Sequence, residues 1–152
     1  MPPIVDITDR VRLQAMLESL APNTLPTWGL MTPQKMIEHL SENVSYTNGK
    51  RFADLDIPLE EALMRKESAI YGDFEMPRGI GGFGDPNTAN RCADIPAAIE
   101  ELLDELKTFD FYYVENPAAT TIHSGFGPLT HNEWIIWHGK HFGHHFRQFR
   151  LI

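Results

Sequence analysis

Apolar residues recur at helical spacing in four segments of the chain, and this periodicity constrains the fold more than any other feature. The segments cover residues 6–20, 32–49, 94–113 and 130–152. A shorter helical stretch follows at residues 58–71, and no convincing run of strands accompanies the helices. We therefore predict an all-α protein, an antiparallel four-helix bundle with a short extra helix.

Three of the expected helices begin with a capping signature. Thr32 can cap the second helix, with Pro33 at its first position, where a missing N–H costs no hydrogen bond. Asp94 stands two residues before another proline and can cap the next long helix in the same way. Thr130 and Glu133 form a capping-box pattern at the start of the last helix.

The remaining segments predict connections within a single domain, residues 1–152. Residues 72–93 are rich in Gly, Pro, Asn and Asp and predict a long glycine-rich loop, and residues 120–128 predict a connector. Residues 79–84 match the letters of a dinucleotide-binding fingerprint. No strand precedes them and no helix follows, so we reject that interpretation and expect no nucleotide cofactor.

Charge and cysteine content exclude several classes of protein. The formal net charge is −8, which disfavours binding to nucleic acid or to an anionic membrane surface. Cys92 is the only cysteine, so no disulfide framework or Cys-rich zinc site can form, and no base adjoins it to make it a nucleophile. We see no signal peptide and no stretch long enough to span a bilayer, so we expect a cytoplasmic protein.

Histidines are concentrated in the last helix. The chain has seven, namely His39, His123, His131, His138, His141, His144 and His145. His141 and His145 are four residues apart, so they share one face of a helix and can chelate a single ion. The alternative is that the pair is a chance result of a His-rich segment, with ordinary core or surface histidines.

His39 offers a third ligand from another helix. It stands in the middle of the second helix beside the apolar positions Met36 and Leu40, where it can face the pair His141 and His145. Metal sites in helical bundles are built from such facing side chains. Three histidines leave positions for water or substrate, as in catalytic rather than purely structural sites.

Two stretches of the chain resemble the DinB/YfiT-like superfamily of metalloenzymes, and in particular a bacterial branch of unknown function. They are WGLMTPQKMIEHL at residues 28–40 and FGPLTHNEWIIWHGKHFGHHFRQF at residues 126–149. The resemblance implies a four-helix bundle with one divalent ion (Zn, Ni or Fe) held by His39, His141 and His145. Other members of the superfamily use small thiols in transfer or isomerisation reactions, so a small-molecule or thiol substrate is an expectation here.

Several polar residues are candidates to support such a site. Glu42, Asn43 and Gln148 can accept the second N–H of a metal-bound imidazole, or can be solvated and helix-capping residues instead. His138 can line the same cavity as a proton shuttle, although a polar residue at the edge of the core is the simpler interpretation. We expect His144 on the surface or at an interface, and the sequence leaves the role of His123 open.

The three tryptophans are expected in the core or in the wall of a pocket. They are Trp28, Trp134 and Trp137.

Three hypotheses about function follow. The first is a metal-dependent enzyme of the hydrolase or thiol-dependent transferase class. The second is a noncatalytic bundle that a structural metal stabilises and that acts as a binding or stress-related protein. The third is a metal-free interaction protein. A homodimer is compatible with each, because bundles often pair through helix faces.

Overall fold

The computed structural model describes residues 2–79 and 88–152 of the chain. It is mostly helical with one small sheet. The elements in order are α1 (Arg10–Glu18), α2 (Pro33–Ser45), α3 (Leu59–Lys66), the π-helix η1 (Glu67–Tyr71), α4 (Ile95–Glu115), β1 (Thr121–His123), β2 (Gly127–Leu129) and α5 (His131–Gln148). Within the described part of the chain, no helix is long and apolar enough to cross a membrane.

The capping residues begin the helices as the sequence predicts. The side chain of Thr32 accepts a hydrogen bond from the backbone N–H of Lys35, and Asp94 accepts one from Ala97. Thr130 and Glu133 form both hydrogen bonds of a capping box. The expected helices are confirmed, but α1 begins four residues later than predicted and α2 ends at Ser45 rather than at residue 49.

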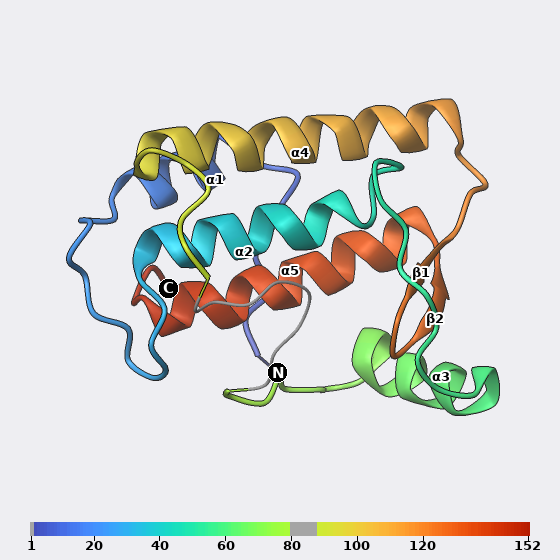
Figure 1. Ribbon diagram of the computed structural model, residues 1–152. Helices are drawn as coiled ribbons and strands as arrows, with labels where there is room; N and C mark the ends of the chain where they lie inside the picture. The colour runs from blue at the N-terminus through green and yellow to red at the C-terminus, as the bar shows by residue number, and fades with distance from the viewer. Residues whose placement is uncertain (1, 80–87) are drawn as a thin grey trace.

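Figure 1 shows α2, α4 and α5 lying lengthwise beside one another, with α1 at one end. Helix α5 runs opposite to α2 and α4, whereas α2 and α4 run in the same direction. The chain between them, which includes α3 and η1, returns to the end of the molecule where α2 began. Helix α3 lies apart from the long helices and beside the two strands.

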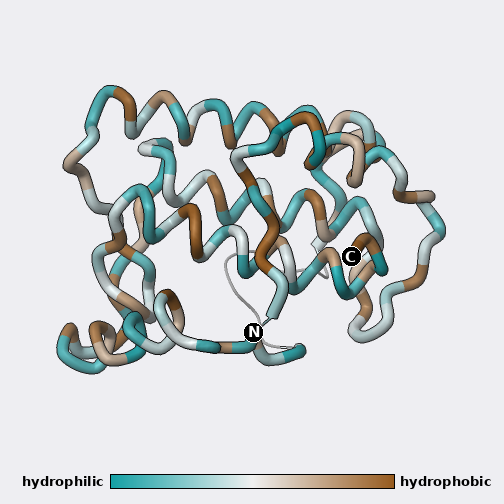
Figure 2. Tube along the Cα trace, turned by 180° about the vertical axis from the view of Figure 1, so that it is seen from behind, coloured by the Kyte–Doolittle hydropathy of each residue, from teal (hydrophilic) through white to brown (hydrophobic). Residues whose placement is uncertain are grey.

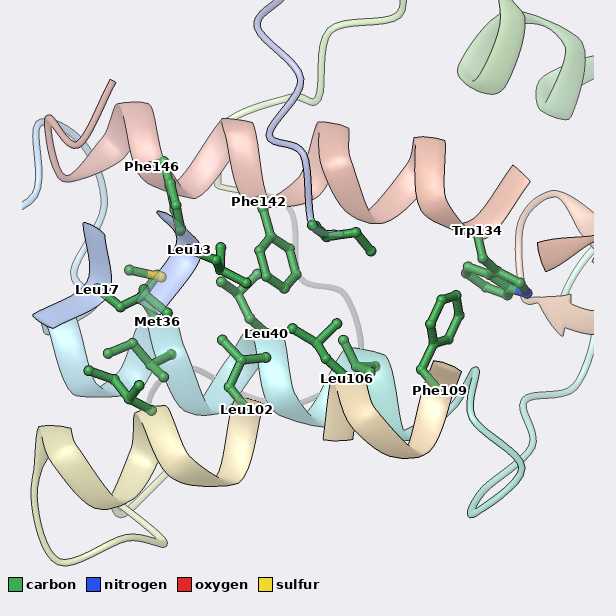
Figure 3. Close-up of a cluster of buried hydrophobic side chains, with 14 of the residues drawn as sticks. Leu13, Leu17, Met36, Leu40, Leu102, Leu106, Phe109, Trp134, Phe142 and Phe146 are labelled. Atoms are coloured by element: carbon green, nitrogen blue, oxygen red, sulfur yellow. The ribbon is translucent and has the colours of Figure 1, made fainter. Parts of the chain in front are cut away.

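The hydrophobic core fills the space between the long helices and α1. Hydrophobic residues recur along each helix between hydrophilic ones, as the colouring of Figure 2 shows. Figure 3 shows these side chains converging from four helices; those labelled are Leu13, Leu17, Met36, Leu40, Leu102, Leu106, Phe109, Trp134, Phe142 and Phe146. All ten are almost completely buried. This packing fixes α2 against α5, the two helices that carry the candidate ligands.

The fold is helical as predicted except at residues 121–129, where a short antiparallel hairpin takes the place of the expected connector. Thr121 pairs with Leu129, and His123 pairs with Gly127. Gly127 has a φ of +76°, a backbone conformation that favours glycine. Strands of three residues are too short to show an alternating pattern, so periodicity could not predict them.

The expected long loop is partly described. Residues 72–79 and 88–93 contain no helix or strand. The rejected dinucleotide fingerprint, residues 79–84, lies outside the described residues apart from Gly79.

Candidate metal centre

Helices α2 and α5 bring together the three histidines that the sequence singles out as ligands. His39 projects from α2, and His141 and His145 project from the same face of α5, one turn apart. Nε2 of His141 lies 3.1 Å from Nε2 of His39 and 3.1 Å from Nε2 of His145. One nitrogen from each residue lies within 4.8 Å of the others, and we call these three residues the histidine cluster.

The geometry of the histidine cluster suits a single ion. Two imidazole nitrogens bound at about 2.0–2.1 Å to one tetrahedral ion are about 3.3 Å apart, close to the distances here. The rings meet edge to face, with interplanar angles of 86° for His39 and His141 and 65° for His141 and His145. Donor nitrogens of all three rings therefore lie close enough together to share one ion.

A hydrogen-bonded amide fixes the orientation of His145. The side-chain nitrogen of Gln148 donates to the carbonyl of Trp28 at 2.9 Å, so its oxygen faces Nδ1 of His145 at 2.8 Å. An oxygen at that position accepts a proton from Nδ1, which leaves the lone pair on Nε2 for a metal. Gly29, whose φ is +74°, lets the chain turn beside this amide.

The other two candidate ligands have different surroundings. The amide nitrogen of Asn43 lies 3.4 Å from Nδ1 of His39 and donates to the carbonyl of His39 at 2.9 Å. Nδ1 of His141 is buried and has no hydrogen-bond partner within residues 2–79 and 88–152. Glu42, the third predicted support, is turned toward arginines instead, 3.5 Å from Arg51.

Burial keeps His141 and His145 uncharged. His39, His141 and His145 are each less than a tenth exposed. Desolvation, together with the other nearby histidines, lowers the pKa of His145 to about 3 and lowers that of His141 well below its usual value. Neutral imidazole is the form that binds a metal ion.

The donor set therefore fits a divalent cation. With the proton of His145 on Nδ1, its Nε2 offers only a lone pair to His141. A single proton on Nε2 of His141 can satisfy one of its two close neighbours but not both. A cation at the centre satisfies all three lone pairs at once, which protons shared between the rings cannot do.

The histidine cluster opens into a cavity of about 730 Å³, which we call the histidine cavity. Its walls are largely aromatic. They include Trp28 from the loop before α2, Phe74 from the segment after η1, Phe126 from the hairpin and Trp137 from α5. Phe126 meets Trp137 edge to face with ring centroids 4.8 Å apart. A cavity of this size admits a small molecule.

Two further histidines line the histidine cavity. His144, which we expected at the surface or at an interface, is instead buried and contacts the ring of Trp28. His123 comes from β1, and its ring stacks on Phe126 with centroids 4.0 Å apart. Sequence spacing could not reveal either role, because His144 meets a tryptophan from the loop before α2 and His123 lies in a short hairpin that periodicity does not predict.

His138 belongs to the core rather than to the histidine cavity. It is 1% exposed, and its Nε2 lies 3.0 Å from the hydroxyl of Thr47. That hydroxyl donates to the carbonyl of Val44, so it accepts the proton of His138. Burial lowers the pKa of His138 to about 3. The simpler of our two interpretations therefore holds, and His138 is not a proton shuttle for the cavity.

Two other residues singled out in the sequence lie outside the histidine cavity. Trp134 is a core residue whose indole N–H donates to Thr121. Cys92 hydrogen-bonds the carboxylate of Glu101, and desolvation together with that carboxylate raises the pKa of its thiol to about 11. A thiol held in its neutral form is a poor nucleophile, as the sequence leads us to expect.

Comparison of the chain with protein-family models, curated proteins and solved structures finds no match. The function is therefore argued from the histidine cluster and the cavity beside it.

Proposed function

We propose that the protein is a metal-dependent enzyme whose single divalent ion is bound by His39, His141 and His145. The observation that carries the proposal is the convergence of three buried imidazole nitrogens at one end of a cavity. Three protein ligands leave coordination positions open toward the cavity. From the resemblance of residues 28–40 and 126–149 we also propose that the protein is a DinB/YfiT-like four-helix bundle, with α1, α2, α4 and α5 as the four helices.

The proposed reaction is hydrolysis or transfer to a small thiol. When bound, the ion supplies Lewis-acid chemistry that lowers the pKa of a water or thiol held in an open position. Gln148 orients His145 for this role through its hydrogen bond to Nδ1. The aromatic side chains of the cavity exclude bulk water and hold the body of a substrate against the open positions.

Elemental analysis of untagged protein, purified without a nickel column, tests the ligand assignment. We expect about one divalent ion per chain in the wild type and its loss in His141→Ala. His144→Ala is the matched control, because His144 lies in the same helix and lines the same cavity but is outside the histidine cluster. Full metal content in His141→Ala would overturn the assignment.

A second candidate function, a noncatalytic bundle with a structural metal, has one observation in its favour. The ion would connect α2 to α5 and so would stabilise the fold. Chelation separates the two candidates. If the enzyme proposal holds, circular dichroism shows a folded apoprotein with a lowered melting temperature. Complete unfolding on chelation at room temperature would favour the structural role.

A further inference from the structure

His123 occupies a position in the histidine cavity that the metal proposal does not use. It projects from β1, which lies in the hairpin and not in either helix of the histidine cluster. Its ring stacks on Phe126 at an interplanar angle of 8° and meets Trp137 edge to face at 85°. Contacts on its face and its edge hold the imidazole in one orientation.

The protonation of His123 follows from its own turn. The backbone N–H of Gly125 donates to Nδ1 of His123 at 3.1 Å. Nδ1 therefore carries a lone pair, and the proton of the neutral ring is on Nε2. No atom of the described residues hydrogen-bonds Nε2, so an N–H donor remains for a molecule in the cavity. Burial lowers the pKa of His123 to about 4, which keeps this donor uncharged near neutral pH.

The charge of the histidine cavity limits its ligand. Among the described residues of the lining, Asp56 is the one charged side chain, and there is no lysine or arginine. The nearest guanidinium, that of Arg78, lies over the ring of Trp28 with its carbon 4.1 Å from the ring centroid. Phosphate and other polyanions are usually recognised by arginine or lysine side chains, which this lining does not supply.

We propose that the histidine cavity binds a flat, uncharged aromatic molecule whose acceptor atom receives the Nε2–H of His123. The aromatic body packs among Phe74, Phe126 and Trp137, and the acceptor fixes its orientation relative to the histidine cluster. This proposal rests on the proposed function for the role of the ion, but the binding itself depends on His123 and the aromatic walls.

Binding of small probes to the zinc-loaded full chain, followed by ligand-observed NMR and by tryptophan fluorescence, tests the proposal. Benzamide carries a flat ring and a carbonyl acceptor, cyclohexanecarboxamide keeps the acceptor without the flat ring, and phenyl phosphate replaces the neutral group by an anion. We expect benzamide to bind about threefold or more tightly than cyclohexanecarboxamide. Because the proposed ion would itself attract an anion, the comparison is repeated with the metal-free chain, and tighter binding of phenyl phosphate than of benzamide there would overturn the assignment of an uncharged ligand.

The variant His123→Phe isolates the hydrogen bond, because phenylalanine keeps a flat ring against Phe126 but has no N–H. We expect benzamide to bind about fivefold more weakly to this variant, the loss of one ordinary hydrogen bond, while binding of toluene changes little. Equal affinity of benzamide for the variant and the wild type would overturn the role of His123.

Two further measurements separate a failure of the role of His123 from a failure of the metal proposal. In wild-type protein labelled with ¹⁵N-histidine, benzamide is expected to shift the Nε2–H resonance of His123, and this readout needs no folded variant. Zinc content is measured in the same samples. A wild type that binds benzamide as described but holds no divalent ion after incubation with zinc, nickel or iron contradicts the metal proposal alone. A zinc-loaded protein in which that resonance does not respond to benzamide contradicts the role of His123 alone.

Discussion

Gln148 connects the loop before α2 to a proposed metal ligand. Its amide donates to the carbonyl of Trp28 and faces Nδ1 of His145 with its oxygen. The hydrogen bond to Trp28 prevents the amide from turning over, so the amide specifies which nitrogen of His145 carries the proton. A residue outside the histidine cluster thereby prepares one of its lone pairs.

Replacement of Gln148 by leucine is expected to weaken metal binding. The leucine variant leaves Nδ1 of His145 without an acceptor, and loss of such a partner typically lowers metal affinity about 10-fold or more. Competition with a chromophoric chelator measures the change. Gln148→Glu is the matched control, because a carboxylate still accepts from His145. Wild-type affinity in Gln148→Leu would show that the amide does not support the ligand.

At the scale of single residues, the sequence predicted which histidines meet but not what surrounds them. The helical spacing of His141 and His145 placed both on one face of α5, and the position of His39 among apolar residues of α2, together with the resemblance, predicted that it faces them. The environment of His144 depends on Trp28, more than a hundred positions away in the chain. Contacts of this range leave no periodic signal in a sequence.

Helix α5 also carries two glycines that make room for the N-terminal segment. A Cβ built on Gly143 would collide with the carbonyl oxygen of Pro3, and one on Gly139 would lie 2.6 Å from Ile4. The backbone N–H of Val5 donates to the carbonyl of Gly139 at 3.0 Å. The glycines therefore allow residues 3–5 to lie directly against the helix that carries His141 and His145.

Gly143→Ala is expected to destabilise the protein by up to about 2 kcal/mol in urea unfolding. Alanine favours a helix by about 1 kcal/mol, but the clash with Pro3 forces the N-terminal segment to move, and overpacking costs about 1 to 3 kcal/mol. Gly125→Ala is the matched control, since the nearest atoms to its Cβ would lie 3.8 Å away in the ring of His123. Equal stability of Gly143→Ala and the wild type would mean that the segment adapts freely.

The elements were predictable where local chemistry defines them. Three helices begin with a capping side chain that accepts a hydrogen bond from the backbone N–H three residues later. The capping residues are Thr32, Asp94 and Thr130, and their residue types predict this interaction from the sequence. The hairpin was not predictable, because its short strands gain their stability from α3 and α5 around them. The parallel direction of α2 and α4 depends on the long connection between them, for which helical periodicity gives no rule.

At the scale of the whole molecule, polar contacts attach α3 and η1 to the rest of the fold, because α3 buries little apolar surface. Ala62 is the one buried residue of α3, and the helix lies apart from the others (Figure 1). The ammonium group of Lys140 donates to the carbonyl of Ala69 at 2.7 Å and to that of Gly72 at 2.9 Å. The next segment of chain carries Phe74, so these bonds also position one wall of the histidine cavity.

Glu133 makes the second connection, between α3, η1 and the start of α5. Its carboxylate lies 2.8 Å from the ammonium of Lys66 and accepts a 2.7 Å hydrogen bond from Tyr71. Desolvation, the largest single effect, would raise the pKa of Glu133. Hydrogen bonds from Lys66, Thr130 and Tyr71 outweigh it and lower the pKa from 4.5 to about 2.

The charge of Glu133 is therefore expected to make stability depend on pH in acid. Because its pKa is lower in the folded than in the unfolded chain, the stabilisation is complete above pH 4.5 and is lost as the pH falls toward 2. The contribution is about 2 to 3 kcal/mol. Urea unfolding of the wild type between pH 6 and pH 2.5, compared with Glu133→Gln, measures it.

The glutamine variant keeps the capping box with Thr130, since an amide oxygen can accept the same backbone N–H, but it removes the charge and replaces the oxygen that accepts from Tyr71 by an NH₂ group. We expect the wild type to have the larger free energy of unfolding at pH 6, and the difference between the two proteins to disappear as the pH falls. Lys66→Met is expected to remove part of the same pH dependence, because Lys66 is the cation that favours the ionised carboxylate. A constant difference between the wild type and Glu133→Gln across this range would show that the ion pair does not hold α3 and η1 in place.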